Sequence, residues 1–113
     1  MSRLSTHVLD LTTGRPAAGM TIRLERLNGT TWTPLATTRT DDAGRVKDLL
    51  TSEHPLAKAT YKLTFETTEY FGARGEVCFY PHVVVTFEVQ DASRPCHVPL
   101  LLSPYGYSTY RGS

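Results

Sequence analysis

Two histidines of the 113-residue sequence, His7 and His97, stand where an imidazole could take part in acid–base chemistry. A neutral imidazole has a pKa near ~6.5, so it can accept a proton from water near neutral pH. His7 lies in a stretch of alternating residues, which is typical of a β-strand, and Ser5 shares its face. A single histidine in a strand is commonly an ordinary surface residue, so spacing alone does not establish a site.

The C-terminal segment places further polar side chains opposite a predicted core face. The more apolar of its two alternating sets consists of Cys96, Val98, Leu100 and Leu102. His97 belongs to the other set and is therefore predicted to point away from the core. In the next predicted strand, Gly106, Ser108 and Tyr110 share one side. Ser108 and Tyr110 are thus further candidates.

The elements that must position these residues are short strands. Apolar residues alternate with period two almost throughout, and Gly, Pro, Asn and Asp interrupt the pattern at short intervals. The pattern predicts strands over residues 4–10, 20–27, 31–40, 45–48, 61–66, 83–89, 96–102 and 105–110. Only residues 51–59 resemble a helix, with a Ser or Thr cap and a pair of alanines, whereas residues 70–79 resemble a long connection. Seven or eight strands in one domain over residues 1–113 indicate an all-β sandwich.

Composition excludes several classes of function. The net charge of +1 comes from 12 basic and 11 acidic residues without long runs of one sign, so no nucleic-acid partner is expected. No stretch approaches the roughly 20 apolar residues of a membrane span, and the first residues lack the apolar region of a signal peptide. We therefore expect a cytoplasmic protein with no membrane partner. Cys78 and Cys96 lack metal-ligand spacing and are expected to be reduced thiols.

Several segments of the chain resemble the 5-hydroxyisourate hydrolase family of transthyretin-like proteins. Residues 100–113, LLLSPYGYSTYRGS, are similar to the signature of that family. Further matches are STHVLD at 5–10, GRPA at 14–17, TDDAGR at 40–45 and FYP at 79–81. Transthyretin itself shares the VLD and LLSPY segments but lacks His7, Arg45, His97 and the terminal residues 110–113. Pro95 and Cys96 depart from the pattern, where the family has a histidine and an aromatic residue.

The resemblance implies a transthyretin-like (prealbumin-like), two-sheet β-sandwich with one short helix. It also implies a homotetramer whose active sites lie at the dimer–dimer interface and act on 5-hydroxyisourate, with no metal and no cofactor. The product would be 2-oxo-4-hydroxy-4-carboxy-5-ureidoimidazoline, an intermediate of urate (purine) catabolism. The residues implied for catalysis are His7, Arg45 and His97. Those implied for substrate binding are Ser108, Tyr110 and Ser113.

Hydrolysis of the cyclic amide carbon–nitrogen bond requires water to attack a carbonyl. His7 and His97 would position and deprotonate that water, and Arg45 would stabilise the negative charge that develops. Which histidine is the base stays open. One alternative is a carrier that holds a small aromatic ligand, without reacting with it, in a transthyretin-like channel between the four subunits. Another is a zinc site, although His54 and His82 have no evident reason to converge with the pair.

Overall fold

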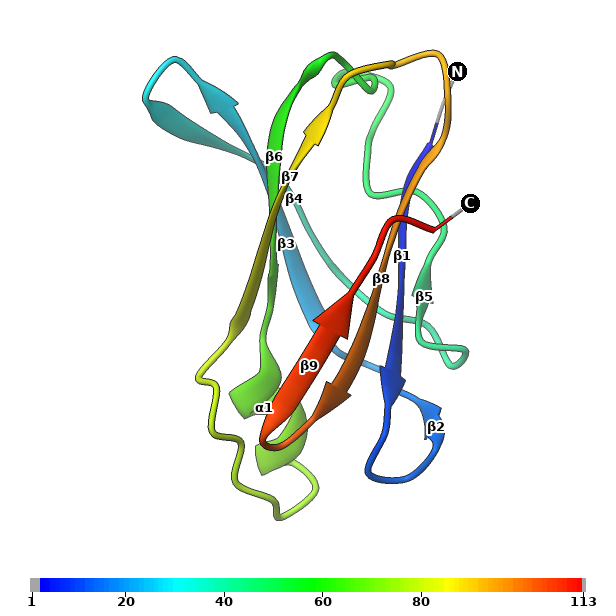
Figure 1. Cartoon of the computed structure of the whole chain (residues 1–113), viewed down its shortest axis with the longest axis vertical. Coiled ribbons are helices and arrows are strands. Elements are labelled where there is room, and N and C mark those ends of the chain that lie inside the picture. The colour runs from blue at the N-terminus through cyan, green and yellow to red at the C-terminus, as the bar shows by residue number, and fades with distance from the viewer. Residues whose placement is uncertain (1–2, 113) are drawn as a thin grey trace.

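The computed structural model describes residues 3–112, which form nine strands and one short helix (Figure 1). The strands are β1 (Leu4–Asp10), β2 (Arg15–Pro16), β3 (Thr21–Asn28), β4 (Thr31–Arg39), β5 (Arg45–Val46), β6 (Ala59–Phe65), β7 (Val83–Val89), β8 (Cys96–Ser103) and β9 (Gly106–Thr109). The helix is α1 (Thr67–Gly72). The predicted strands are therefore present, although β5 is shorter than expected and Tyr110 lies just beyond the end of β9.

The strands form two sheets that face each other across the core (Figure 1). The first sheet has the order β2-β1-β8-β9, and β5 also pairs with β1. The second sheet has the order β4-β3-β6-β7. Strand β1 runs parallel to β8, and this pairing joins the start of the chain to its last third. The predicted all-β sandwich is confirmed.

Alternating side chains from the two sheets fill the core. In β1, residues 4, 6, 8 and 10 are buried and the residues between them are partly exposed. In β8, Cys96, Val98, Leu100 and Leu102 are buried, as the alternation predicted, while His97 is partly exposed. Pro99 is the exception, because it is buried although it belongs to the outer set. Tyr61 and Phe65 from β6 are fully buried opposite them. Burial of this apolar surface specifies which face of each strand points outward.

The prediction of a helix over residues 51–59 is wrong. Residues 51–58 contain no helix, and the His54 amide donates to the Thr51 carbonyl in a turn. Pro55 cannot donate a backbone hydrogen bond to continue a helix, and Ala59 already belongs to β6. The helix is α1, which begins in the segment after β6 and overlaps the stretch predicted to be a connection. Tyr70 and Phe71 are buried on its inner side, so packing decides where the helix forms.

No helix within residues 3–112 is long and apolar enough to cross a membrane.

Candidate active site

The predicted site residues gather on the outer face of the first sheet, where strand pairing arranges them in rows. Ser5 of β1 pairs with His97 of β8, and His97 in turn forms an isolated bridge with Gly112. In the next row, Arg45 of β5 pairs with His7 of β1. One strand spacing and a two-residue step separate the two histidines, so their backbones lie roughly 8 Å apart. The structure therefore brings His7, Arg45 and His97 together from three separate segments.

A backbone carbonyl orients the His7 ring. His7 Nε2 lies 2.9 Å from the Ala43 carbonyl oxygen. A carbonyl oxygen only accepts hydrogen bonds, so Nε2 carries the hydrogen and donates it. In the neutral ring, Nδ1 is then the nitrogen with a free lone pair. Sequence reasoning could not find this contact, because the partner is a main-chain atom.

The turn that supplies this carbonyl also positions Arg45. Asp41 Oδ1 accepts hydrogen bonds from the amides of Ala43 and Arg45, each at 2.9 Å. The bond from the Arg45 amide lowers the pKa of Asp41; desolvation opposes this, and the bond from the Ala43 amide adds to the lowering. Gly44 completes the turn with φ +74° and lies directly against Val8 of β1. The TDDAGR segment thus delivers a carbonyl to His7 and an arginine beside it.

His97 is held by a neighbour that the sequence did not single out. Ser5 Oγ lies 2.8 Å from His97 Nδ1. Burial, followed by the electrostatic effects of His7 and Arg45, lowers the pKa of His97, and a hydrogen bond with the Ser5 backbone only partly offsets this. The neutral imidazole is therefore favoured near neutral pH, as a general base requires.

A hollow of about 550 Å³ lies beside these residues and carries positive charge. Arg45 and His97 line it together with Arg3 and Lys47, and no Asp or Glu is among its lining residues. His7 does not line this hollow, although Arg45 is its partner in the strand pairing. Arg3 and Lys47 were not predicted, since single exposed cations carry no signal in the sequence. The hollow suits an oxygen-rich substrate with developing negative charge.

The predicted substrate-binding residues are placed less closely together. Ser108 pairs with Leu101, which is four residues along β8 from His97. Tyr110 is 56% exposed. Ser113 lies outside the described residues. The tail does reach the site through Gly112, whose amide donates to the His97 carbonyl at 2.8 Å.

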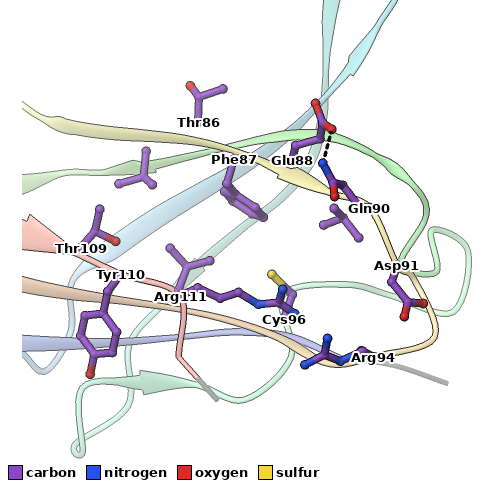
Figure 2. Close-up of a pocket in the computed structure, with 13 residues that line it drawn as sticks. Thr86, Phe87, Glu88, Gln90, Asp91, Arg94, Cys96, Thr109, Tyr110 and Arg111 are labelled. Atoms are coloured by element: carbon purple, nitrogen blue, oxygen red, sulfur yellow. Dashed lines mark hydrogen bonds between the residues drawn. The ribbon is translucent and has the colours of Figure 1, made fainter.

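A second cavity, of about 450 Å³, lies away from the histidines between β7 and the end of β9. Figure 2 shows the Arg111 side chain reaching toward Cys96, while the Tyr110 ring points to the other side of the tail. Both residues nevertheless line this cavity. No histidine lines this cavity, so it lacks the imidazole base that the outer face of the first sheet offers.

Metal-ligating groups do not cluster in the described part of the chain: residues 3–112 hold no set of three or more His, Cys, Asp or Glu side chains that could bind an ion.

Comparisons with known proteins agree with this architecture. A family model described as the HIUase/Transthyretin family matches residues 4–112. Mouse 5-hydroxyisourate hydrolase is 46% identical over 114 residues, which cover 99% of this chain and 96% of the relative. The structure of Klebsiella pneumoniae 5-hydroxyisourate hydrolase superposes with a TM-score of 0.86 at 39% identity over all of both chains. Sea bream transthyretin, solved in complex with thyroxine, has a TM-score of 0.88 at 28% identity over 96% of this chain and 93% of its own. The chain therefore belongs to the HIUase/transthyretin family.

Proposed function

We propose that this protein is a hydroxyisourate hydrolase, which hydrolyses 5-hydroxyisourate to 2-oxo-4-hydroxy-4-carboxy-5-ureidoimidazoline in urate degradation. The mouse and Klebsiella relatives bear the name of this activity. The observation that carries the proposal is the convergence of His7, Arg45 and His97 on one outer sheet face. Two imidazoles and a guanidinium provide proton transfer and charge stabilisation without a cofactor.

The reaction requires a proton acceptor for water and a cation beside the attacked carbonyl. Water attacks the carbonyl carbon, and its proton passes to a neutral imidazole. The negative charge that develops on the carbonyl oxygen is stabilised by the Arg45 guanidinium, whose planar fork fits a carbonyl or ureide edge. The carbon–nitrogen bond then breaks, and the imidazolium returns the proton to the leaving nitrogen. General-base help of this kind is worth roughly 10²- to 10⁴-fold.

The remaining proposed site residues bind the substrate. Ser108, Tyr110 and Ser113 would hold its polar edges by hydrogen bonds. Arg3 and Lys47 support this arrangement, because they add positive charge to the hollow that Arg45 and His97 line. A long-range field of this sign raises the local concentration of an electron-rich substrate.

We further propose a homotetramer with its active sites at the dimer–dimer interface. Two observations support it: the histidine face is open in a single chain, and Tyr105 and Leu11 are 76% and 56% exposed. Burying the face between subunits would exclude water and strengthen the interaction of Arg45 with the developing charge. Light scattering should give a mass of about 50 kDa, four times the 12.6 kDa of one chain. A monomer with full activity would refute the proposal that the active site lies between subunits.

The deciding experiment follows the absorbance of freshly generated 5-hydroxyisourate with and without the folded protein. We expect faster decay with the wild-type protein, and decay at the buffer rate with a His7→Ala, His97→Ala double variant. The carrier alternative rests on the likeness to the sea bream transthyretin–thyroxine complex. Binding of an aromatic ligand combined with substrate decay at the buffer rate would favour that alternative.

A further inference from the structure

The His97 ring is confined on two sides by neighbouring segments. On one side, Ser5 Oγ lies 2.8 Å from Nδ1. On the other, the tail passes so close that a Cβ on Gly112 would lie 2.4 Å from His97 Cδ2 and 3.1 Å from Cγ. A contact this short does not occur between ordinary side chains, so only a glycine lets the tail lie there without moving the ring.

The two contacts determine which edge of the ring faces outward. Nδ1 and Cδ2 are the two ring atoms that flank Cγ, where the ring joins the side chain. With both flanks occupied, the distal edge, formed by Cε1 and Nε2, points away from the sheet. In residues 3–112, Nε2 makes no protein hydrogen bond, whereas Nδ1 has Ser5. In Figure 1 the three contributing segments, β1, β8 and the tail after β9, lie next to one another.

We propose that Ser5 and Gly112 are positioning residues for the reaction proposed above, holding His97 so that Nδ1–H donates to Ser5 Oγ while Nε2 accepts the proton of the attacking water. This inference deepens the proposed function and rests on it. It assigns a direction to a hydrogen bond that a hydroxyl can make as donor or as acceptor.

The direction follows from what a base at Nε2 needs. If Ser5 donated to Nδ1, the hydrogen of the neutral ring would sit on Nε2, and Nε2 could not accept another proton. With Ser5 as acceptor, the O–H bond of water breaks, its proton moves to Nε2, and the imidazolium keeps its Nδ1–H bond to Ser5. When the carbon–nitrogen bond breaks, Nε2 gives the proton to the leaving nitrogen. The Ser5 contact persists in both charge states and needs no rearrangement during the reaction.

The charged groups around His97 favour the neutral base before reaction. His7 faces it from β1 and Arg45 from β5, and Arg3 and Lys47 line the same hollow. The tail contributes Gly112, which carries no side-chain charge. A hydrogen bond with the Ser5 backbone acts in the opposite direction and favours the protonated ring. In the proposed direction, the Ser5 hydroxyl accepts from Nδ1–H and also favours the protonated ring, so removal of this hydroxyl should lower the pKa of His97 further.

Substitutions at the two flanks test the kinetic part of the proposal. Ser5→Ala and Gly112→Ala should each lower kcat/KM by roughly 10- to 100-fold, the effect of a misplaced catalytic group. Ser5→Thr keeps the hydroxyl and should recover most of the activity. The controls are Ser52→Ala, at an exposed turn, and Gly72→Ala, where a Cβ would meet nothing within 4 Å. Both controls should leave the rate unchanged.

The pH profile distinguishes positioning from a loss of structure. In Ser5→Ala the acidic limb of kcat/KM should move to lower pH, because the protonated His97 loses an acceptor. If Ser5 had a purely structural role, Ser5→Ala would lower the plateau value of kcat/KM and leave the acidic limb of the pH profile in place. An unmoved limb, or full activity in both Ser5→Ala and Gly112→Ala, would overturn the proposal.

Nitrogen-15 NMR of the wild-type imidazoles tests the tautomer without any turnover. Above the pKa of His97, the hydrogen should reside on Nδ1, and Ser5→Ala should shift the population toward Nε2–H. A wild-type ring with its hydrogen on Nε2 would mean that Ser5 donates and would refute the assignment. If the protein fails to hydrolyse 5-hydroxyisourate while the Nδ1–H tautomer is present, the proposed function fails and the arrangement of the ring stands.

Discussion

Replacing Gly44 by alanine should damage the site through a turn that bears none of the proposed catalytic atoms itself. A Cβ at this position would lie 2.5 Å from the Val8 carbonyl oxygen and 3.1 Å from the Ala17 amide. The Val8 carbonyl already accepts from that amide at 2.9 Å, and the Val8 amide donates to the Gly44 carbonyl at 2.8 Å. The added methyl group therefore cannot be accommodated unless the turn moves away from β1.

The size of the effect follows from this distance. Restoring an ordinary contact of 3.4 Å or more requires a shift of about 1 Å, which would carry with it the Ala43 carbonyl that orients His7 and the backbone of Arg45. A misplacement of about 1 Å can reduce the rate by ~100-fold. The positive φ adds roughly 1–2 kcal/mol of strain for an L-residue, and overpacking adds about 1–3 kcal/mol.

Gly29→Ala is the matched control, because Gly29 has φ +64° at the tip of the β3–β4 hairpin and a Cβ there would meet nothing within 4 Å. It should lose only the strain energy and keep full activity. The assays are denaturant unfolding and the initial decay rate of 5-hydroxyisourate at equal folded concentration. Wild-type turnover in folded Gly44→Ala would refute the view that this turn positions His7 and Arg45.

Three further outcomes are expected. Arg45→Lys should lower kcat/KM by roughly tenfold or more, because lysine keeps the charge but loses the planar fork; unchanged kinetics would leave Arg45 a long-range role only. Tyr110→Phe should lower kcat/KM by about tenfold, which corresponds to the loss of one hydrogen bond. Deletion of residues 110–113 should abolish most activity, while light scattering should give the same number of subunits as for the wild-type protein. Thermal stability should fall as the pH drops below the 6.5 of an ordinary histidine, because the lowered pKa of folded His97 means that the unfolded chain binds more protons there. His97→Asn should weaken that pH dependence, and an identical profile in the variant would contradict the lowered pKa.

The outward orientation of His97 was predictable because the other face of its strand is strongly apolar. That of His7 was less clear, because Thr6 and Asp10 belong to the buried set of β1. Alternation alone specifies the face, since a shift by one residue would expose the core set. The pairing of β1 with β8 was not predictable in this way, because 92 residues separate Leu4 from Cys96 in the chain. The resemblance to a family, rather than the local pattern, brought the two histidines and Arg45 into one hypothesis.

The misplaced helix and the missed contacts have different causes. Residues 51–59 satisfied local preferences for a helix, but burial of Tyr70 and Phe71 places the helix elsewhere. Ser5 shared a face with His7 in the sequence pattern, yet its partner across the strand pair is His97. The Ala43 carbonyl could not be found from residue types at all, because every residue has one.

The parallel pairing of β1 with β8 also determines when the site can form during folding. One edge of residues 4–10 finds its partners among residues 96–102, and Gly112 of the tail must then add to the same row. Long-range contacts of this kind require closure of a loop that spans most of the chain, which slows folding. During synthesis on the ribosome, β1 has no partner on this side until β8 has emerged. Until then, the edge of β1 that later pairs with β8 is exposed to other chains. His97 meets Ser5 only when that edge closes, so the geometry that supports hydrolysis is also a sign that the first sheet has finished folding.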